Sequence, residues 1–291
     1  MEIDQTTRKT DRKHSGAFQR LELLTGSKAL ERLMNTPVIL FGVGGVGSWC
    51  AEALVRSGIH NLTIVDSDII CITNINRQVQ ATFDTVGQVK VTALRDRLIS
   101  INPAASINAM QAVYDRNTAA EFELEKYSYV IDAIDSLSSK VELIINASAS
   151  GAKVYSALGA SCKTDPSRIK VTSLWQTEGC RLGRFVRKRL RRRGFNGEVT
   201  CVYSDELASE PYDIKLGCGT GACMCPSSGK IGNGELKDWC SVKKQINGSA
   251  VHITGVFGFM LAGLVIQDIK NSDTPVPVST EAEQVPVMHE G

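Results

Sequence analysis

Short runs of apolar residues alternate with amphipathic segments over the first 160 residues of the chain. The apolar runs predict buried strands at residues 38–41, 61–66, 127–135 and 152–158. Apolar residues recurring every three or four positions predict helices at residues 17–35, 46–57, 86–102 and 138–150, with Pro103 closing the third. Buried strands separated by helices predict an α/β fold with a doubly wound, mostly parallel sheet that is covered on both faces.

The hydrophobic pattern of the second half of the chain predicts two further helices. An amphipathic helix is predicted at residues 181–194, and residues 253–266 form an apolar run of 14 positions, shorter than the roughly 20 residues of a membrane-spanning helix, so we interpret it as a buried helix. We expect a flexible N-terminus at 1–16, a nucleotide-binding core at 17–165, a C-terminal part of the same fold at 166–270 and a disordered tail at 271–291.

A glycine-rich turn lies between the first predicted strand and the helix that follows it. Gly42, Gly44 and Gly47 form a G-x-G-x-x-G pattern in "FGVGGVGSWC". Such a turn lets phosphates approach backbone N–H groups at the positive end of a helix, as in Rossmann-like folds. Asp66 ends the next predicted strand, where a carboxylate can accept hydrogen bonds from a ribose. The pattern suits NAD or FAD as well as ATP.

Further charged residues favour ATP over a dinucleotide. Arg77 and Lys90 follow Asp66, and Asp132 and Asp135 end the strand "VIDAID", so all four are expected at the carboxyl ends of the strands. A triphosphate that loses pyrophosphate needs cations and a Mg²⁺ ion held by a carboxylate to neutralise the developing charge. These residues therefore predict nucleotidyl transfer.

Composition and charge narrow the class further. The chain has 43% hydrophobic residues and nine cysteines, and its polar start lacks the apolar core of a signal peptide, so we expect a cytoplasmic protein with reduced thiols. The net charge of +2 conceals a concentration of Arg and Lys in residues 181–194. Like charges on one helix repel each other, which favours a polyanionic partner, with nucleic acid first and a membrane surface second. Within this helix we expect nucleic-acid contacts from Arg184, Arg187, Lys188, Arg191 and Arg192.

The segments "GVGGVGS", "DSDIICITNINRQ", "VGQVK" and "IDAID" resemble the family of ubiquitin-activating enzymes and of the adenylyltransferases of thiamine and molybdopterin biosynthesis. The resemblance implies ATP-dependent adenylation of a carboxylate by a homodimer. It implies that Arg20 reaches the neighbouring subunit's site, that Asp135 binds Mg²⁺, and that Arg20, Arg77, Lys90 and Asp135 are catalytic. The implied nucleotide-binding residues are Gly42, Gly44, Gly45, Gly47, Asp66, Asp68, Asn74, Arg77 and Lys90.

The order of several weaker motifs over residues 17–270 resembles one branch of this family, the tRNA threonylcarbamoyladenosine dehydratases. That resemblance implies that the carboxylate of the modified base is adenylated and that the carbamoyl group then closes the ring, with loss of one water. Two alternatives remain open: an adenylyltransferase for a carrier protein ending in Gly-Gly, and a non-catalytic RNA-binding module. Requirements for a monovalent cation and for a sulfur-relay protein partner also remain open.

The cysteines suggest two further hypotheses. Cys180 precedes the basic helix, where carrier-protein relatives place a thioester cysteine, but an ordinary thiol is preferred because the cyclisation needs no enzyme nucleophile. Four other cysteines form a C-x4-C-x-C-x14-C pattern that suits a structural zinc site, although paired C-x-x-C motifs are absent. These are Cys218, Cys223, Cys225 and Cys240.

Overall fold

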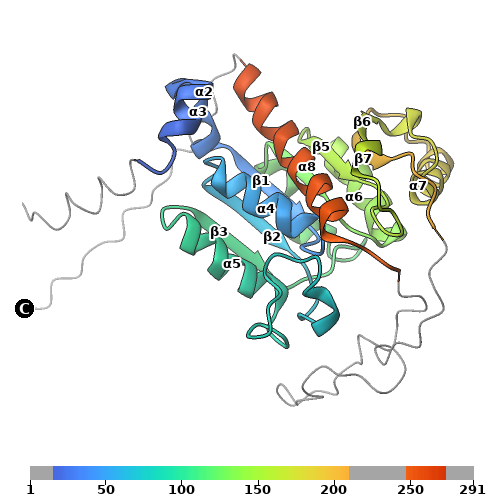
Figure 1. The fold of residues 1–291 in the computed structure, drawn as a ribbon. Helices are drawn as coiled ribbons and strands as arrows, with labels where there is room; N and C mark the ends of the chain where they lie inside the picture. The colour runs from blue at the N-terminus through green and yellow to red at the C-terminus, as the bar shows by residue number, and fades with distance from the viewer. Residues whose placement is uncertain (1–15, 210–246, 273–291) are drawn as a thin grey trace, which may run out of the picture.

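The computed structural model describes residues 16–209 and 247–272, which form a sheet between two helical layers (Figure 1). The strands are β1 (Pro37–Phe41), β2 (Asn61–Val65), β3 (Ser106–Met110), β4 (Tyr129–Asp132), β5 (Lys153–Ala157), β6 (Ile169–Ser173) and β7 (Thr200–Ser204). The helices are α2 (Gln19–Thr25), α3 (Ser27–Asn35), α4 (Gly47–Arg56), α5 (Lys90–Ile101), α6 (Leu137–Ala149), α7 (Arg181–Arg192) and α8 (Val251–Asn271).

The sheet has the order β3-β2-β1-β4-β5-β7-β6, and every neighbouring pair is parallel except β6 and β7. From β1 the chain first adds β2 and β3 on one side of the sheet. It then returns and adds β4 and β5 on the other side, so the order of strand addition reverses between β1 and β4. Ligands of doubly wound folds bind beyond the carboxyl ends of the strands at this point. The predicted Rossmann-like, mostly parallel α/β fold is confirmed.

Alternate residues of each strand supply two separate cores. In β1, Val38 and Leu40 pack with α4, α5 and α8, whereas Ile39 and Phe41 pack with α6 and α7 on the other face. This is the two-residue periodicity of a strand buried on both faces. The glycine turn after β1 is therefore anchored from both sides of the sheet.

Several elements differ from the sequence-based expectation. The helix expected at residues 17–35 is divided into α2 and α3 at Gly26, whose φ of 83° lies in the left-handed region. Strands β3, β6 and β7 were not predicted. In β3 and β6 most side chains are exposed or half-buried, so their sequences lack a long apolar run. The division into domains at residue 165 stays a prediction; β5 and β7, which lie on either side of it, pair in one sheet.

The apolar run at 253–266 belongs to a longer helix than we expected. Helix α8 has 21 residues, and by length and composition it is the one helix of the described residues that could cross a membrane. However, Ile253, Phe257, Leu261 and Val265 are fully buried. Gly258 fits so closely against α4 that an added Cβ would lie 2.5 Å from the carbonyl oxygen of Val46. This packing supports the interpretation of a core helix.

Candidate active site

Two glycines of the turn are required by the backbone around them. Gly42 has a φ of 85°, and a Cβ there would lie 2.8 Å from the carbonyl oxygen of Ala133. A Cβ on Gly47 would lie 1.8 Å from the carbonyl oxygen of Gly42. Any side chain at either position would displace the turn from β4 or from the start of α4.

The middle glycines shape the open side of the turn. The nearest atom to a Cβ on Gly44 would be Nε2 of Gln78, at 4.0 Å, so this position leaves free space in front of the backbone. A Cβ on Gly45 would lie 3.1 Å from Thr254 of α8 and 3.3 Å from the Arg77 side chain. Helix α4 begins at Gly47 with no acidic residue in its first turn. The turn thus presents an open backbone surface that suits a phosphate group.

Asp66 lies at the carboxyl end of β2 and faces the glycine turn. Its Oδ2 accepts the N–H of Val43 at 2.8 Å, and its Oδ1 accepts the N–H of Asp68 at 2.9 Å. Burial raises the pKa of Asp66, and the positive charge of Lys90 opposes this shift. The carboxylate is held rigidly, and each oxygen has a further lone pair for a ribose hydroxyl.

Lys90 and Asp68 form an ion pair beside Asp66. The Lys90 Nζ lies 2.8 Å from the Asp68 Oδ2, and the Lys90 side chain is 6% exposed. The backbone N–H of Lys90 also donates to the carbonyl oxygen of Asp68, at 3.0 Å. The start of α5 is thereby fixed against the loop that follows β2, so the expected cation stands next to the expected ribose site.

The loop after β2 carries Asn74 and Arg77. Asn74 is buried, and its side-chain oxygen accepts the N–H of Cys71 at 3.0 Å, so it shapes the loop itself. Arg77 donates to the carbonyl oxygen of Thr73 at 2.8 Å, and its own carbonyl accepts the indole N–H of Trp49 at 2.9 Å. Burial lowers the pKa of Arg77, and electrostatic interaction with Cys71 and Asp135 opposes that shift. Arg77 and Asp135 thus lie close enough to interact electrostatically.

The two aspartates after β4 take different positions. Asp135 is exposed, as expected for a metal-binding carboxylate at the mouth of the crevice. Asp132 is fully buried, which corrects the expectation that it lies in the crevice. Its Oδ2 accepts hydrogen bonds from Lys140 Nζ and Ser156 Oγ, both at 2.6 Å, while Oδ1 accepts the N–H of Ile134 at 3.1 Å. Asp132 therefore holds the turn that presents Asp135.

Arg20 lies far from these residues within its own chain. It is exposed on α2, where Phe18 packs against His60 and Leu21 approaches Gly58, just before β2 begins. Helix α2 is thus placed at the amino ends of the strands, whereas the crevice lies at their carboxyl ends. One chain does not bring Arg20 to its own site.

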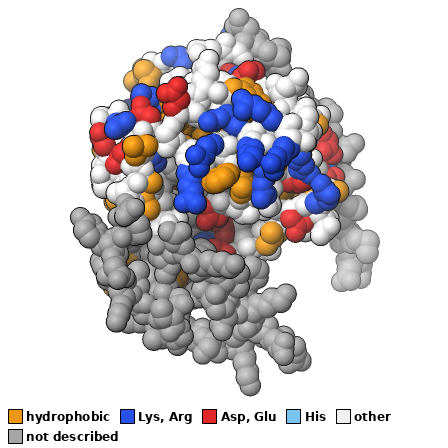
Figure 2. All heavy atoms as spheres, turned by 90° about the vertical axis from the view of Figure 1, so that its right-hand side faces the viewer, with side chains coloured by type: hydrophobic (Ala, Val, Ile, Leu, Met, Phe, Trp, Pro, Cys, Tyr) orange, Lys and Arg blue, Asp and Glu red, His pale blue; other side chains and the backbone are white. Residues whose placement is uncertain are grey.

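Basic side chains gather on the face of the molecule that carries α7 (Figure 2). Arg184, Lys188, Arg191 and Arg192 are exposed, whereas Arg187 is half-buried and donates to the hydroxyl of Thr177 and the carbonyl oxygen of Leu174. Arg187 therefore holds α7 in place, so its inclusion among the nucleic-acid contacts is not supported by this geometry. The helix packs through Val186 and Leu190.

Two further residues near α7 have environments that bear on the site. Phe185 precedes the buried Val186 but is itself 36% exposed, with the guanidinium of Arg184 5.2 Å from its ring centre. Cys180 is buried, and its sulfur accepts the N–H of Gly183 at 3.4 Å, so it caps the start of α7 as an ordinary structural thiol would. The candidate zinc ligands Cys218, Cys223, Cys225 and Cys240 lie outside the described residues.

Gln78 and Lys140 are site residues that the sequence analysis missed. The Oε1 of Gln78 is buried without a hydrogen-bond donor among residues 16–209 and 247–272, although Gln78 adjoins the open side of Gly44. An orphaned acceptor beside free space fits a bound ligand with N–H or O–H groups. The position of Gln78 directly after Arg77 was the sequence feature that could have identified it. No sequence feature identified Lys140, because its role depends on burial within the fold.

The residues fit a nucleotide and a magnesium ion. The open glycine turn, Asp66, Arg77 and Lys90 lie in the segments that follow β1 and β2, beside the point between β1 and β4 where the order of strand addition reverses. In the part of the chain that the structure describes, no group of three or more His, Cys, Asp or Glu is arranged to hold a metal by itself. Mg²⁺ is commonly bound by one or two carboxylates together with substrate phosphates, so the single exposed Asp135 is compatible with that ion.

Comparison with known proteins agrees with this geometry. The ThiF family model matches residues 18–280. The tRNA threonylcarbamoyladenosine dehydratase of Bacillus subtilis is 34% identical over 252 residues, covering 87% of this chain and 94% of that protein. The Escherichia coli dehydratase in complex with ATP has a TM-score of 0.71 at 30% identity and covers 92% of this chain and 97% of that one. The molybdopterin-synthase adenylyltransferase of Escherichia coli is 31% identical, with coverage of 69% of this chain and 79% of that protein.

Both the family match and the near-complete coverage of the dehydratases lead to the same assignment. In the structure Arg77 lies beside Gly45 of the glycine turn and near Asp135, and Lys90 pairs with Asp68 in the loop after β2. The chain belongs to the ThiF family, on the branch of the tRNA threonylcarbamoyladenosine dehydratases.

Proposed function

We propose that this protein is an ATP-dependent enzyme that cyclises threonylcarbamoyladenosine in tRNA. The observation that carries the proposal is the likeness, over 92% of this chain, to a dehydratase crystallised with ATP. The crevice supports it, because its cations and open glycine turn suit a triphosphate. Several relatives with high coverage carry the dehydratase name, including those of Haemophilus influenzae and Escherichia coli.

The proposed reaction has two steps. A carboxylate oxygen of the threonyl group attacks the α-phosphorus of ATP, and the bond to pyrophosphate breaks. The carbamoyl group then attacks the activated carbonyl carbon and loses a proton, and AMP leaves with one oxygen of the former carboxylate. The nucleoside is lighter by one water. Because the second nucleophile belongs to the substrate, proximity replaces an enzyme nucleophile, which agrees with the structural position of Cys180.

Each part of the crevice has a role in this scheme. The open backbone at Gly44 accommodates phosphate oxygens, and Asp66 accepts hydrogen bonds from the ribose. Arg77 and Lys90 neutralise charge on the phosphates as pyrophosphate departs. Asp135 would hold Mg²⁺, which supplies further charge neutralisation at the phosphates when bound.

A second copy of the chain completes the site in this proposal. Arg20 is exposed at the opposite end of the sheet from its own crevice, so it can act only on a neighbouring subunit. Leu23 and Leu24 on the same helix are 84% and 73% exposed, which is an apolar surface that a partner subunit would cover. We therefore propose a homodimer in which each α2 serves the partner's crevice.

Helix α7 is the proposed tRNA contact. Arg184, Lys188, Arg191 and Arg192 of this helix are exposed. An enzyme for a small carrier protein has less need for such a surface, so α7 favours the dehydratase over the adenylyltransferase alternative. Binding through phosphate contacts weakens steeply with salt.

The nucleotide product tests this proposal. Labelled ATP is incubated with the protein and with tRNA that carries threonylcarbamoyladenosine, and AMP and ADP are separated by chromatography. We expect AMP in an amount equal to the modified nucleoside consumed, and none above background with unmodified tRNA. ADP as the product, or AMP formation that depends on a carrier protein ending in Gly-Gly and not on tRNA, would contradict it.

A further inference from the structure

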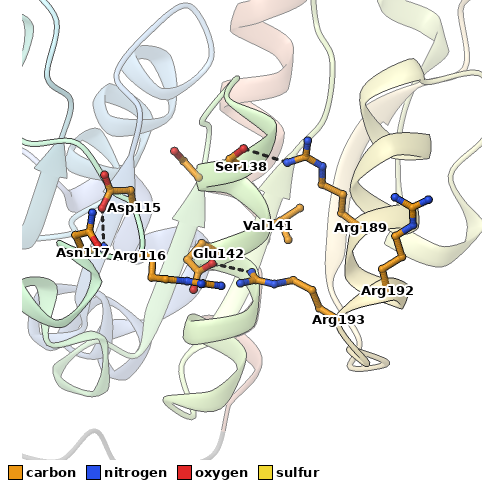
Figure 3. A pocket seen from close by; sticks show the side chains of 10 residues that line it. Asp115, Arg116, Asn117, Ser138, Val141, Glu142, Arg189, Arg192 and Arg193 are labelled. Atoms are coloured by element: carbon orange, nitrogen blue, oxygen red, sulfur yellow. Dashed lines mark hydrogen bonds and ion pairs between the residues drawn. The ribbon is translucent and has the colours of Figure 1, made fainter.

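A cavity of about 450 Å³ lies between the first half of α6, the end of α7 and the turn at residues 115–117 (Figure 3). It lies on the α6 and α7 side of the sheet and is separate from the glycine-turn crevice. Four arginines and two carboxylates supply its charged lining, so the net charge is positive. They are Arg116, Arg189, Arg192, Arg193, Asp115 and Glu142.

Both carboxylates already have partners within the protein. Oδ1 of Asp115 accepts the backbone N–H groups of Asn117 at 2.7 Å and of Thr118 at 3.2 Å. Oε2 of Glu142 accepts a hydrogen bond from Arg193 at 2.7 Å. Neither acid is therefore placed to attract a cationic ligand.

The remaining arginines are available to an anion. Arg189 is steadied by the hydroxyl of Ser138, with a donor–acceptor distance of 3.0 Å. Arg116 and Arg192 are exposed and donate to no acceptor among the residues that the structure describes. In Figure 3, Arg116 reaches toward α6 from the side opposite to α7. Guanidinium groups on two sides of one hollow give it a positive charge, and each can donate two parallel hydrogen bonds to a phosphate.

The position of the cavity connects it to the crevice. Helix α6 begins at Leu137, two residues after Asp135, and Ser138 and Ser139 of its first turn line the cavity. A nucleic acid strand that delivers a base to Asp135 would pass over this turn and continue toward Arg116.

We propose that the cavity binds the tRNA backbone next to the modified nucleotide, with Arg116 and Arg192 each contacting one of two phosphates. The inference rests on the proposed function and adds a contact that the basic helix alone does not include, because Arg116 belongs to the segment between β3 and β4. Val141 is the one hydrophobic residue in the described lining, so the cavity does not suit an apolar ligand.

The test compares full-length variants by fluorescence anisotropy with labelled tRNA carrying threonylcarbamoyladenosine, over a series of KCl concentrations. Arg116→Gln should weaken tRNA binding by about five- to tenfold near 0.1 M salt and reduce the salt slope by about 1. Arg116→Gln with Arg192→Gln should reduce the slope by about 2. Arg95→Gln is the matched control, because Arg95 is also exposed but lies on α5 on the other face of the sheet.

Two results would overturn the phosphate site. One is binding by Arg116→Gln with the affinity and salt slope of Arg95→Gln. The other is an equal loss of ATP affinity in the absence of tRNA, which would place Arg116 at the nucleotide crevice. The proposed function is judged separately, by AMP formation in the unmodified protein: if that fails while the slope still changes, the cavity remains an RNA phosphate site in a protein of another activity.

Discussion

Asp66 shows how one side chain links the fold to nucleotide binding. Its carboxylate joins the glycine turn to the loop after β2 through the N–H groups of Val43 and Asp68. Because burial raises its pKa, the folded chain holds a proton on Asp66 more tightly than the unfolded chain does. The resulting contribution to stability is complete below the unfolded pKa and is lost as the pH rises through the folded pKa.

Replacing Asp66 by Asn should weaken ATP binding by about 10- to 100-fold, because hydrogen bonds to a charged acceptor contribute about 1.5–3 kcal/mol. Titration calorimetry with ATP measures this directly. Asp84→Asn, an exposed carboxylate in the same loop region, is the control and should bind ATP as the original protein does. ATP affinity unchanged in Asp66→Asn would show that the ribose lies elsewhere.

Lys140 and Asp132 form a fully buried ion pair below the crevice, with both side chains 0% exposed. Lys140→Met would leave the carboxylate without its cation and should cost about 3–5 kcal/mol of unfolding free energy. Urea denaturation followed by tryptophan fluorescence checks the loss. In Lys126→Met, which breaks the exposed pair with Glu123, we expect no measurable change. Equal effects in the two variants would mean that burial of the pair is not decisive.

At the scale of elements, α8 depends on close contact with α4. A Cβ on Gly258 would meet the carbonyl oxygen of Val46 at 2.5 Å and the backbone nitrogen of Cys50 at 2.8 Å. Gly258→Ala should therefore destabilise the protein by about 1–3 kcal/mol, because neither backbone atom can move freely.

Gly263 in the same helix provides the matched comparison, since no atom lies within 4 Å of an added Cβ there. Gly263→Ala should leave stability unchanged or raise it by up to about 1 kcal/mol through helix propensity. Thermal unfolding of both variants by circular dichroism gives the two values. A Gly258→Ala protein as stable as Gly263→Ala would indicate that α8 is not packed on α4 as described.

Sequence pattern predicted the strands with the longest apolar runs and missed the others, including β7, which is buried but has an apolar run only at residues 201–203. Strands β1, β2, β4 and β5 are buried on both faces, so each reads as an apolar run. Strand β3 lies at the edge of the sheet and is partly exposed, which removes that signal. The break at Gly26 was missed because the hydrophobic period continues through it, whereas only the backbone angle shows the turn.

Site residues could be predicted where residue type and position relative to a strand suggest the role of a side chain. Glycines after a strand and charged residues at strand ends could be named before any coordinates, and the structure places Lys90 near Asp66 and Arg77 beside Gly45. The same reasoning misplaced Asp132, because a carboxylate at a strand end is buried or exposed according to its tertiary partners. Lys140, 8 residues further along the chain, decides that outcome.

For the whole molecule, we propose cooperation between subunits, because Arg20 is exposed on α2, far from the glycine turn of its own chain. If α2 serves the partner's crevice, each active site takes Asp135 from one subunit and Arg20 from the other. Arg20→Ala and Asp135→Ala therefore inactivate a site through different subunits. Mixed after brief unfolding and refolding, the two inactive variants should form heterodimers with one intact site and recover about a quarter of the original activity. Activity no higher than that of either variant alone would contradict action across the dimer.

The central claim is that this enzyme removes one water from threonylcarbamoyladenosine in tRNA at the expense of ATP. The most direct measurement incubates the protein with ATP, Mg²⁺ and tRNA carrying that nucleoside, digests the tRNA and determines the nucleoside masses. We predict a nucleoside lighter by one water that forms only with ATP and is absent with Asp135→Ala. An unchanged nucleoside mass, under conditions where the protein binds both ATP and the tRNA, would contradict the account.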